Sequence, residues 1–212
     1  MKQINESEIR SMDHRYRATL INSLAGVRPA VLVGTKSASG HTNLAVFNSL
    51  IHIGADPALW GLLVRPSSVR RDTLNNILET GDYTINFISS GMHKAVHLTS
   101  AKFPENISEF ESCGFREEYI DSCGAPFVHE AIVKVALKKF STQEISINGT
   151  TLVIGSIQKI ITSDNLIGAD GFFNPEQADV LTCAGLDAYT RVVMSGRWSY
   201  ARPDQPLHPI DF

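Results

Sequence analysis

The sequence predicts a mainly β protein, built as a closed or nearly closed antiparallel barrel with helices packed outside it. Residues 42–53 and 132–140 alternate apolar with small or polar side chains, as strands do when one face meets a core. Residues 152–161 form a long β-rich run soon after Asn148-Gly149, a pair typical of a hairpin turn. Many strands with short turns favour a barrel, because closure leaves no long strand edge exposed.

The first third of the chain predicts a helix followed by a hairpin. We expect the helix over residues 7–25, with leucine and isoleucine side chains along one face and Gly26 as its C-terminal stop. Residues 30–35 are a short apolar run that predicts a strand. A turn of small polar residues then leads into the alternating segment 42–53, which is expected to pair with that strand.

The next segments alternate between strand and helix. Residues 59–65 are nearly all apolar, which suits a strand buried on both faces. A helical pattern over residues 72–79 runs up to Gly81, and residues 83–89 return to a strand. The elements expected farther along are short helices over 94–98, 108–113 and 172–178 and strands over 132–140 and 152–161.

Length and charge narrow the class of protein. The 212 residues suit one domain spanning residues 1–212, and 43% hydrophobic residues are typical of a globular chain. A net charge of -3 offers no electrostatic footprint for nucleic acid. The N-terminus lacks the apolar core of a signal peptide, and no apolar run approaches the roughly 20 residues that span a bilayer. We therefore expect a cytoplasmic protein without a membrane or nucleic-acid partner.

The cysteine and histidine patterns indicate neither a metal site nor a set of disulfide bonds. Cys113, Cys123 and Cys183 are an odd number without a C-x-x-C pair, so reduced structural thiols are expected. His93 and His97 are four residues apart and share one helix face, but no cysteine or carboxylate pattern completes a metal site. No G-x-S-x-G, H-E-x-x-H, P-loop or G-x-G-x-x-G motif is present, so the sequence predicts no acid–base catalytic residue.

Two segments predict a ligand site. The strand pattern of residues 42–49 places small or polar side chains opposite apolar ones, which suits contact with a polar ligand on one face. Arg71-Asp72-Thr73 opens the helix expected over residues 72–79, where backbone N–H groups and the helix dipole favour an anion. Arg71 and Thr73 therefore predict a phosphate site, with helix capping by Asp72 and Thr73 as the structural alternative.

The order and spacing of several short motifs resemble the flavin reductase-like proteins of the FMN-binding split-barrel group, including its flavoredoxin branch. The match covers most of the chain. Its motifs are Leu20-Ile21-Asn22-Ser23-Leu24, Arg28-Pro29-Ala30-Val31-Leu32-Val33-Gly34-Thr35, Asn43-x-Ala45-x-Phe47-Asn48-Ser49, Asp56-Pro57, Arg71-Asp72-Thr73-x-x-Asn76-Ile77, Thr80-Gly81-Asp82-Tyr83-x-x-Asn86, Ser100-Ala101-x-Phe103, Ala125-Pro126 and Gly185-x-x-x-Tyr189.

The resemblance implies a six-stranded antiparallel Greek-key split barrel that pairs into a homodimer, with each FMN in the cleft between subunits. It also implies an NAD(P)H-dependent flavin reductase in which hydride passes from NADH or NADPH to the flavin, so the cofactors carry the reaction. The reduced flavin would serve a monooxygenase or another electron acceptor. Two alternatives stay open: an FMN-binding electron-transfer or flavin-carrier protein, and the related pyridoxamine-phosphate oxidase type.

The resemblance and the two ligand segments together give the expected cofactor-binding residues. Polar groups on the strand would line the flavin edge, apolar ones would shape the slot for the ring, and the two arginines would reach the phosphate or ribityl chain. Tyr189 and Trp198 are candidates to border the flavin of a partner subunit. The cofactor-binding set is Thr42, Asn43, Leu44, Ala45, Phe47, Asn48, Ser49, Arg65, Arg71 and Thr73.

Overall fold

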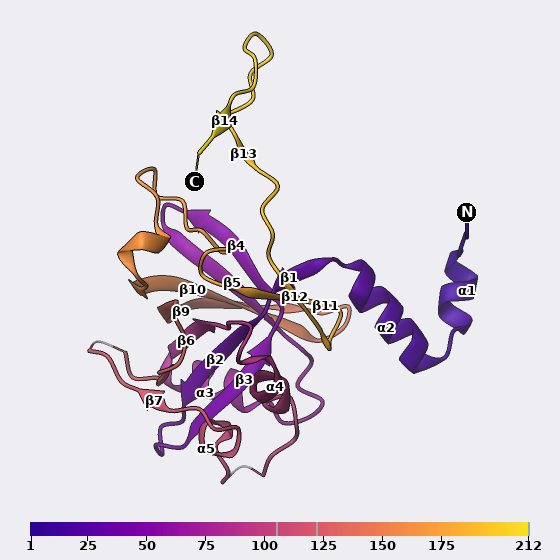
Figure 1. Cartoon of the computed structure of the whole chain (residues 1–212). Coiled ribbons are helices and arrows are strands. Elements are labelled where there is room, and N and C mark those ends of the chain that lie inside the picture. Colours follow the sequence, from indigo (N-terminus) through magenta and orange to yellow (C-terminus); the bar gives the residue numbers. More distant parts are fainter. Residues whose placement is uncertain (105, 122, 212) are drawn as a thin grey trace.

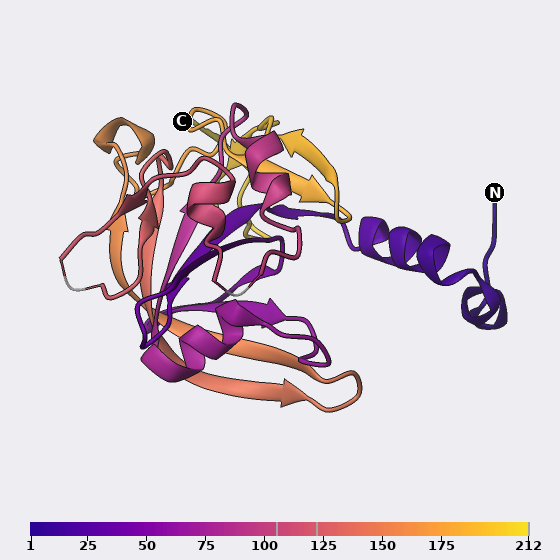
Figure 2. The same ribbon diagram turned by 90° about the horizontal axis from the view of Figure 1, so that it is seen from below.

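The computed structural model describes residues 1–104, 106–121 and 123–211 and is shown in Figures 1 and 2. Strands dominate it, and they pair antiparallel throughout the sheets. The strands are β1 (Val27–Pro29), β2 (Val31–Lys36), β3 (Thr42–Phe47), β4 (Leu50–Ala55), β5 (Ala58–Val64), β6 (Asp82–Phe87), β7 (Glu117–Glu118), β8 (Phe127–Val128), β9 (Lys134–Ile145), β10 (Thr150–Ile161), β11 (Leu181–Ala184), β12 (Ala188–Arg191), β13 (Arg197–Trp198) and β14 (Pro209–Ile210).

The helices are short and lie outside the sheets. They are α1 (Glu6–Ser11), α2 (His14–Leu24), α3 (Asp72–Thr80), α4 (His93–Leu98), α5 (Glu109–Ser112) and the 3-10 turn η1 (Asp164–Leu166). The predicted mainly β architecture with peripheral helices is confirmed. Within the described residues, no helix is long and apolar enough to cross a membrane.

A seven-stranded sheet with the order β3-β2-β6-β9-β10-β5-β4 forms the body. Its two end strands, β3 and β4, follow each other in the chain and are joined only by Asn48-Ser49. This sheet is therefore curled, so that its ends meet at one short connection. It contains one strand more than the six expected, because the segment predicted as a single strand over 42–53 breaks at Asn48-Ser49 into β3 and β4.

A buried cluster fills the inside of the curled sheet. Val31 of β2, Leu62 of β5 and Val153 of β10 belong to it, although β2 is not a neighbour of β5 or β10 in the sheet. Only a strongly curved sheet brings these side chains together. Leu74 and Ile77 of α3 join the same cluster, so this helix packs against the barrel interior and fixes the position of its own N-terminus.

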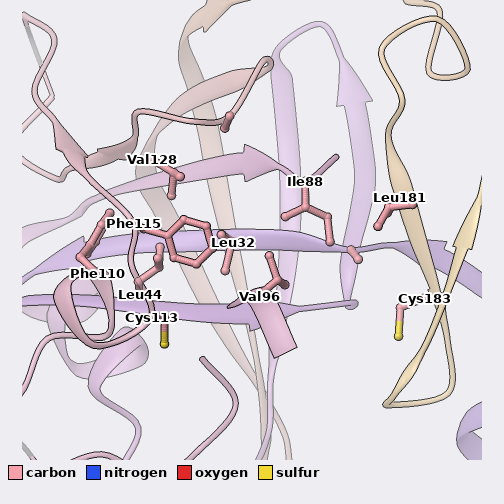
Figure 3. Packing of buried hydrophobic residues seen from close by; sticks show 12 residues of the cluster. Leu32, Leu44, Ile88, Val96, Phe110, Cys113, Phe115, Val128, Leu181 and Cys183 are labelled. Carbon is pink, nitrogen blue, oxygen red and sulfur yellow. The ribbon is translucent and has the colours of Figure 1, made fainter. Parts of the chain in front are cut away.

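A second buried cluster lies on the other face of β2 and β3. Leu32 and Leu44 point from these strands toward Val96 of α4 and Phe110 of α5 (Figure 3). Leu181 and Cys183 of β11 complete this layer. The sheet β1-β11-β12 thereby packs beside β3, and its β11–β12 turn comes close to the end of that strand.

The N-terminal helix departs from the prediction. Instead of one helix over residues 7–25, the chain forms α1 and α2, because Asp13 caps a new helix by accepting hydrogen bonds from the N–H groups of Arg15 and Tyr16. Neither helix has a buried residue, and both lead away from the body in the two views (Figures 1 and 2). Of the predicted apolar face, Ile21 and Leu24 are therefore exposed.

Two other differences are local. Residues 172–178 were expected to be a short helix but form turns and a bridge between Ile167 and Phe173. Pro175 lies within this segment and cannot donate a backbone hydrogen bond. The C-terminal hairpin β13–β14 extends away from the barrel (Figure 1), and it carries Trp198, which is 61% exposed.

Candidate functional site

A cleft of about 920 Å³ opens along β3, an end strand of the seven-stranded sheet. Its walls come mainly from β3 with the following turn, the end of β5 through the start of α3, the end of α4 with the segment after it, and the β11–β12 turn with β1. Asn22 of α2, Glu109 of α5 and Thr150 of β10 also line it. Pockets that hold cofactors and other small molecules commonly measure roughly 300–1,000 Å³. The cleft is thus large enough for a mononucleotide.

One end of the cleft lies at the start of α3. The Asn43 side-chain amide donates a hydrogen bond to Thr73 Oγ1 at 3.0 Å, which ties β3 to the helix. Arg71 stands at the N-cap position, and no side chain caps the helix there. The first backbone N–H groups of α3 are therefore left without the usual side-chain acceptor, an arrangement that suits an anion.

Arg71 is positioned by the chain but keeps hydrogen-bonding capacity. Its Nε donates to the Pro66 carbonyl oxygen at 3.2 Å, which directs the half-buried side chain along the cleft wall. The two Nη atoms have no hydrogen-bond partner among the residues that the structure describes. A guanidinium held in this way presents two donors to a phosphate.

The cleft carries more positive than negative side chains. Arg70 and Asp72 form an ion pair at 2.9 Å, which offsets one charge of each sign. The cationic lining residues are Arg28, Arg65, Arg70, Arg71 and Lys102, and the acidic ones are Asp72, Glu109 and Asp187. This balance is opposite in sign to the net charge of -3 on the whole chain. The local excess favours an anionic ligand.

Two side chains occupy the open edge of β3. Glu109 Oε2 accepts a hydrogen bond from the Leu44 N–H at 3.0 Å, and Thr99 Oγ1 accepts one from the Val46 N–H at 3.0 Å. Burial raises the pKa of Glu109, and the charge of Asp72 raises it further. The N–H groups of Leu44 and Val46 therefore have acceptors within the chain.

The far end of the cleft lies where β3 meets the β11–β12 turn. The Asn48 side-chain amide donates to the Gly185 carbonyl oxygen at 2.5 Å, and Ser49 Oγ donates to the Leu63 carbonyl oxygen at 2.7 Å. Because a strand rises about 3.3 Å per residue, the five residues from Asn43 to Asn48 separate the two ends by roughly 17 Å.

An aromatic and cationic wall stands at this far end. Tyr189 of β12 packs edge-on against His97, with ring centroids 5.9 Å apart. Arg28 of β1 also lines the cleft, and its buried Nε has no hydrogen-bond partner within residues 1–104, 106–121 and 123–211. An unpaired buried donor is costly, so its presence in a cleft wall suits a site where a ligand supplies the acceptor.

The histidine, cysteine and carboxylate side chains of the described residues indicate neither a metal site nor a reactive nucleophile. Among the described residues, no group of three histidine, cysteine or carboxylate side chains could hold a metal ion. The three cysteines are unpaired by disulfides, and burial raises the pKa of each thiol, which disfavours the reactive thiolate.

Comparison with known protein families shows which family the chain is related to. The pattern that defines the family described as "Flavin reductase like domain" matches residues 26–177, which is most of the chain. The chain belongs to the flavin reductase-like family. The matched range contains the cleft residues of β3, β5 and α3, but it ends before β11 and β12.

Solved structures agree with this flavin reductase-like assignment. A Shewanella frigidimarina protein, assigned as a flavin reductase with a split barrel domain, is 38% identical, with a TM-score of 0.92 over 95% of this chain and 100% of that one. Nitrilotriacetate monooxygenase component B from Bacillus cereus is 20% identical, with a TM-score of 0.80 over 93% and 98%. Flavoredoxin of Desulfovibrio vulgaris is also 20% identical, with a TM-score of 0.69 over 96% and 98%. The fold is the split barrel.

The flavin reductase-like fold brings most of the predicted cofactor residues into one cleft. Those that line it are Asn43, Ala45, Phe47, Asn48, Ser49, Arg65, Arg71 and Thr73. Thr42 and Leu44 do not. Thr42 Oγ1 is hydrogen-bonded to Ser108 Oγ at 2.8 Å, and Leu44 is fully buried in the cluster of Figure 3.

Several lining residues escaped the sequence-based prediction. Thr99 and Glu109 are 53 and 65 positions from the β3 groups that they bond, so no local pattern links them. Arg28 belongs to the quoted Arg28-Pro29 motif, yet only the pairing of β1 with β11 brings it to the cleft. Of the two aromatic candidates, Tyr189 lines the cleft, whereas Trp198 lies in the extended C-terminal hairpin.

Proposed function

We propose that the chain is an FMN-binding oxidoreductase that reduces flavin with NADH or NADPH. The observation that carries this proposal is the cleft along β3. It combines an uncapped helix start, an arginine with free donors and a strand of small and polar residues, in a chain of the flavin reductase-like family. The chain as a whole, residues 1–212, would act as one functional domain.

The residues present fit a flavin phosphate at the α3 end. Arg71 would direct its Nη atoms to the phosphate, and the first N–H groups of α3 would add donors. Thr73 is 5% exposed and accepts a hydrogen bond from Asn43, which holds its hydroxyl in place at the cleft wall. Arg65, at the end of β5, would balance the second phosphate charge or contact the ribityl chain.

The rest of the cleft suits the ring. Ala45 and Phe47 of β3 would form the apolar slot, while Asn48 and Ser49 would stand at the polar ring edge. Arg28 would supply its unpaired buried Nε to an acceptor at the far end. Strand geometry separates the two ends of the cleft by roughly 17 Å. This distance is of the same order as the length of an extended FMN molecule.

Hydride transfer between the two cofactors would require the protein mainly to position them. When bound, the flavin supplies a ring that accepts hydride from a nicotinamide. No side chain has to transfer a proton at the reacting atom, which agrees with the raised pKa of the Cys183 thiol in the cleft wall. The residues of the cleft would hold the ring flat, leave one face open and keep the phosphate end fixed.

The proposed assembly is a homodimer that delivers electrons to a separate acceptor such as a monooxygenase. One structurally similar protein is itself named as a monooxygenase component, although at 20% identity that likeness supports the fold alone. The flavoredoxin branch has a lower structural similarity than the Shewanella protein, with TM-scores of 0.69 and 0.92. The greater similarity to the Shewanella protein supports the proposal of a flavin reductase.

A spectrum tests the function. The purified protein is mixed with FMN, freed of unbound flavin, and recorded anaerobically before and after addition of NADH or NADPH. We expect a bound flavin spectrum that bleaches with at least one nucleotide. A bound flavin that stays oxidised with both nucleotides would instead indicate a carrier or electron-transfer protein. A protein that retains no flavin and does not catalyse FMN reduction would contradict both functions.

A further inference from the structure

A buried carboxyl group stands at the same end of the cleft as the proposed phosphate site. Glu109 of α5 is 9% exposed and lines the cleft together with Arg71 and Thr73. Its Oε2 accepts a hydrogen bond from the Leu44 N–H at 3.0 Å, and the preceding residue of β3, Asn43, donates to Thr73 Oγ1 at 3.0 Å. The Glu109 carboxyl group is therefore fixed beside the contact that joins β3 to the start of α3.

No cation forms an ion pair with Glu109 in the part of the chain that the structure describes. Arg70, whose positive charge favours ionisation of Glu109, is itself paired with Asp72 at 2.9 Å and donates to the Phe103 carbonyl oxygen at 3.3 Å. Burial is the largest cause of the raised pKa of Glu109, and the charge of Asp72 raises it further. Because Leu44 uses Oε2, the second oxygen, Oε1, can carry a proton.

The other charged and titratable groups around Glu109 come from several elements. They are Arg70 and Asp72 at the start of α3, Lys102 in the segment after α4, Glu111 and Cys113 on α5 itself, and Glu117 of β7, which accepts a hydrogen bond from the Thr42 hydroxyl at 2.5 Å. Of the acidic groups in this set, Asp72 and Glu109 line the cleft, and Asp72 is already paired with Arg70. A phosphate that enters this end therefore meets Glu109 as a carboxyl group without a cation of its own among the described residues.

Charge repulsion determines the protonation of this carboxyl group when a phosphate enters. A phosphate ester carries a charge of about −1.5 to −2 at pH 7. A second negative charge within about 4–6 Å disfavours the ionised form of a carboxyl group. Protonation replaces repulsion by attraction, since a carboxylic acid can donate its O–H to a phosphate oxygen in a charge-assisted hydrogen bond. Phosphate binding and proton binding at Glu109 therefore favour each other.

We propose that Glu109 is a specificity-determining residue of the phosphate site, and that it binds FMN in its protonated form, with its O–H donated to a phosphate oxygen. The proton comes from solvent when the flavin binds and returns to solvent when the flavin leaves. This inference rests on FMN as the ligand of the proposed function, and it adds a proton as a second ligand of the site. Riboflavin has no phosphate and would bind without the proton, and a rising pH would favour release of FMN.

Calorimetric titration counts the proton. FMN is titrated at pH 8 into the wild type, Glu109→Gln and the control Glu111→Gln, in two buffers with different ionisation enthalpies. The control changes an exposed carboxyl group on the same helix. A phosphate ester with a second pKa of about 6 has already lost its proton at this pH, so its own titration adds little. The wild type and the control should take up about 0.5–1 proton per FMN, whereas Glu109→Gln with FMN and the wild type with riboflavin should take up less than about 0.2.

The same coupling appears in the affinity. Uptake of one proton raises the dissociation constant of FMN by up to about tenfold per pH unit. From pH 7 to pH 8.5 we expect this constant to rise about 5- to 30-fold for the wild type and less than about twofold for Glu109→Gln. The dissociation constant of riboflavin, measured in parallel, should stay within about twofold for both proteins.

The outcomes separate the proton from the function. A wild type that binds FMN with no more proton uptake than Glu109→Gln, or with equal uptake for FMN and riboflavin, overturns the role of Glu109 and leaves the FMN site in place. The comparison of FMN with riboflavin uses the wild type alone, so it decides the matter even if the variant does not fold. A wild type that binds no FMN overturns the proposed function together with this inference. Anaerobic reduction by NADH or NADPH is recorded on the same samples, so the oxidoreductase activity is scored independently of the proton.

Discussion

Glu109 places a carboxyl group in a buried position against the open edge of β3. Burial raises its pKa, so the folded protein binds its proton more tightly than the unfolded chain does. The resulting stabilisation is complete below the unfolded pKa of about 4.3 and is lost as the pH rises through the higher folded pKa. We predict that Glu109→Gln removes this loss, because glutamine keeps an acceptor for the Leu44 N–H without ionising.

Chemical unfolding at several pH values measures the effect. The free energy of unfolding of Glu109→Gln relative to the wild type should increase as the pH rises from acid to neutral. Glu111→Gln changes an exposed carboxyl group on the same helix and should not reproduce this trend. A constant difference between Glu109→Gln and the wild type would show that the carboxyl group titrates equally in both states.

Tyr83 is a fully buried side chain whose hydroxyl lacks a partner in the described part of the chain. Burial also raises the pKa of this hydroxyl. Burying an unpaired hydroxyl costs about 1–3 kcal/mol in proteins. Tyr83→Phe removes this cost and keeps the ring, so the free energy of unfolding should rise by about 1 kcal/mol in urea titrations. A loss of stability would mean that the hydroxyl is partnered, for instance by a buried water.

The helix α3 depends on the residue that follows its last turn. Gly81 ends it with φ +78°, in the left-handed region that costs other residues about 1–2 kcal/mol. We predict that Gly81→Ala lowers the free energy of unfolding by about 1 kcal/mol in urea titrations. Gly91→Ala is the control, because an added methyl group there meets nothing within 4 Å and its φ is not in that region. Equal effects of the two changes would refute the role of the left-handed cap.

Elements with local signals were predictable from the sequence. The helix α3 was expected over residues 72–79 and forms over Asp72–Thr80, because its apolar periodicity and terminal glycine are both local. The β9–β10 hairpin follows from Asn148-Gly149 in the same way, with Gly149 at φ +70°. The break before α2 was missed, since the capping role of Asp13 competes with a continuous helical pattern.

The candidate site was predictable only where its residues lie in one segment. Asn43 to Ser49 and Arg71 to Thr73 were found by strand and helix patterns, and the structure places most of them in one cleft. Thr99 and Glu109 were missed because their bonds to β3 depend on the packing of α4 and α5. Leu44 lies outside the cleft because alternation along β3 turns its side chain into the core.

At the scale of the whole molecule, FMN should stabilise the fold. A ligand selective for the native state adds about 2.7 kcal/mol at 100 times its dissociation constant. For a chain of this size each kcal/mol raises the melting temperature by about 2–4 °C, so we predict an increase of roughly 5–10 °C. Differential scanning calorimetry with FMN at that excess measures it. An unchanged melting temperature would argue against a flavin site in the folded protein.

The role of the cleft as a flavin phosphate site is tested most directly by the affinities of FMN and riboflavin for the wild type and Arg71→Ala. A charge-assisted hydrogen bond contributes about 1.5–3 kcal/mol, so calorimetric titration should show FMN binding weakened roughly 10- to 150-fold. Riboflavin lacks the phosphate and should bind both proteins about equally. Equal losses for the two ligands, or no loss for either, would contradict a phosphate at Arg71 and with it the proposed placement of FMN along β3.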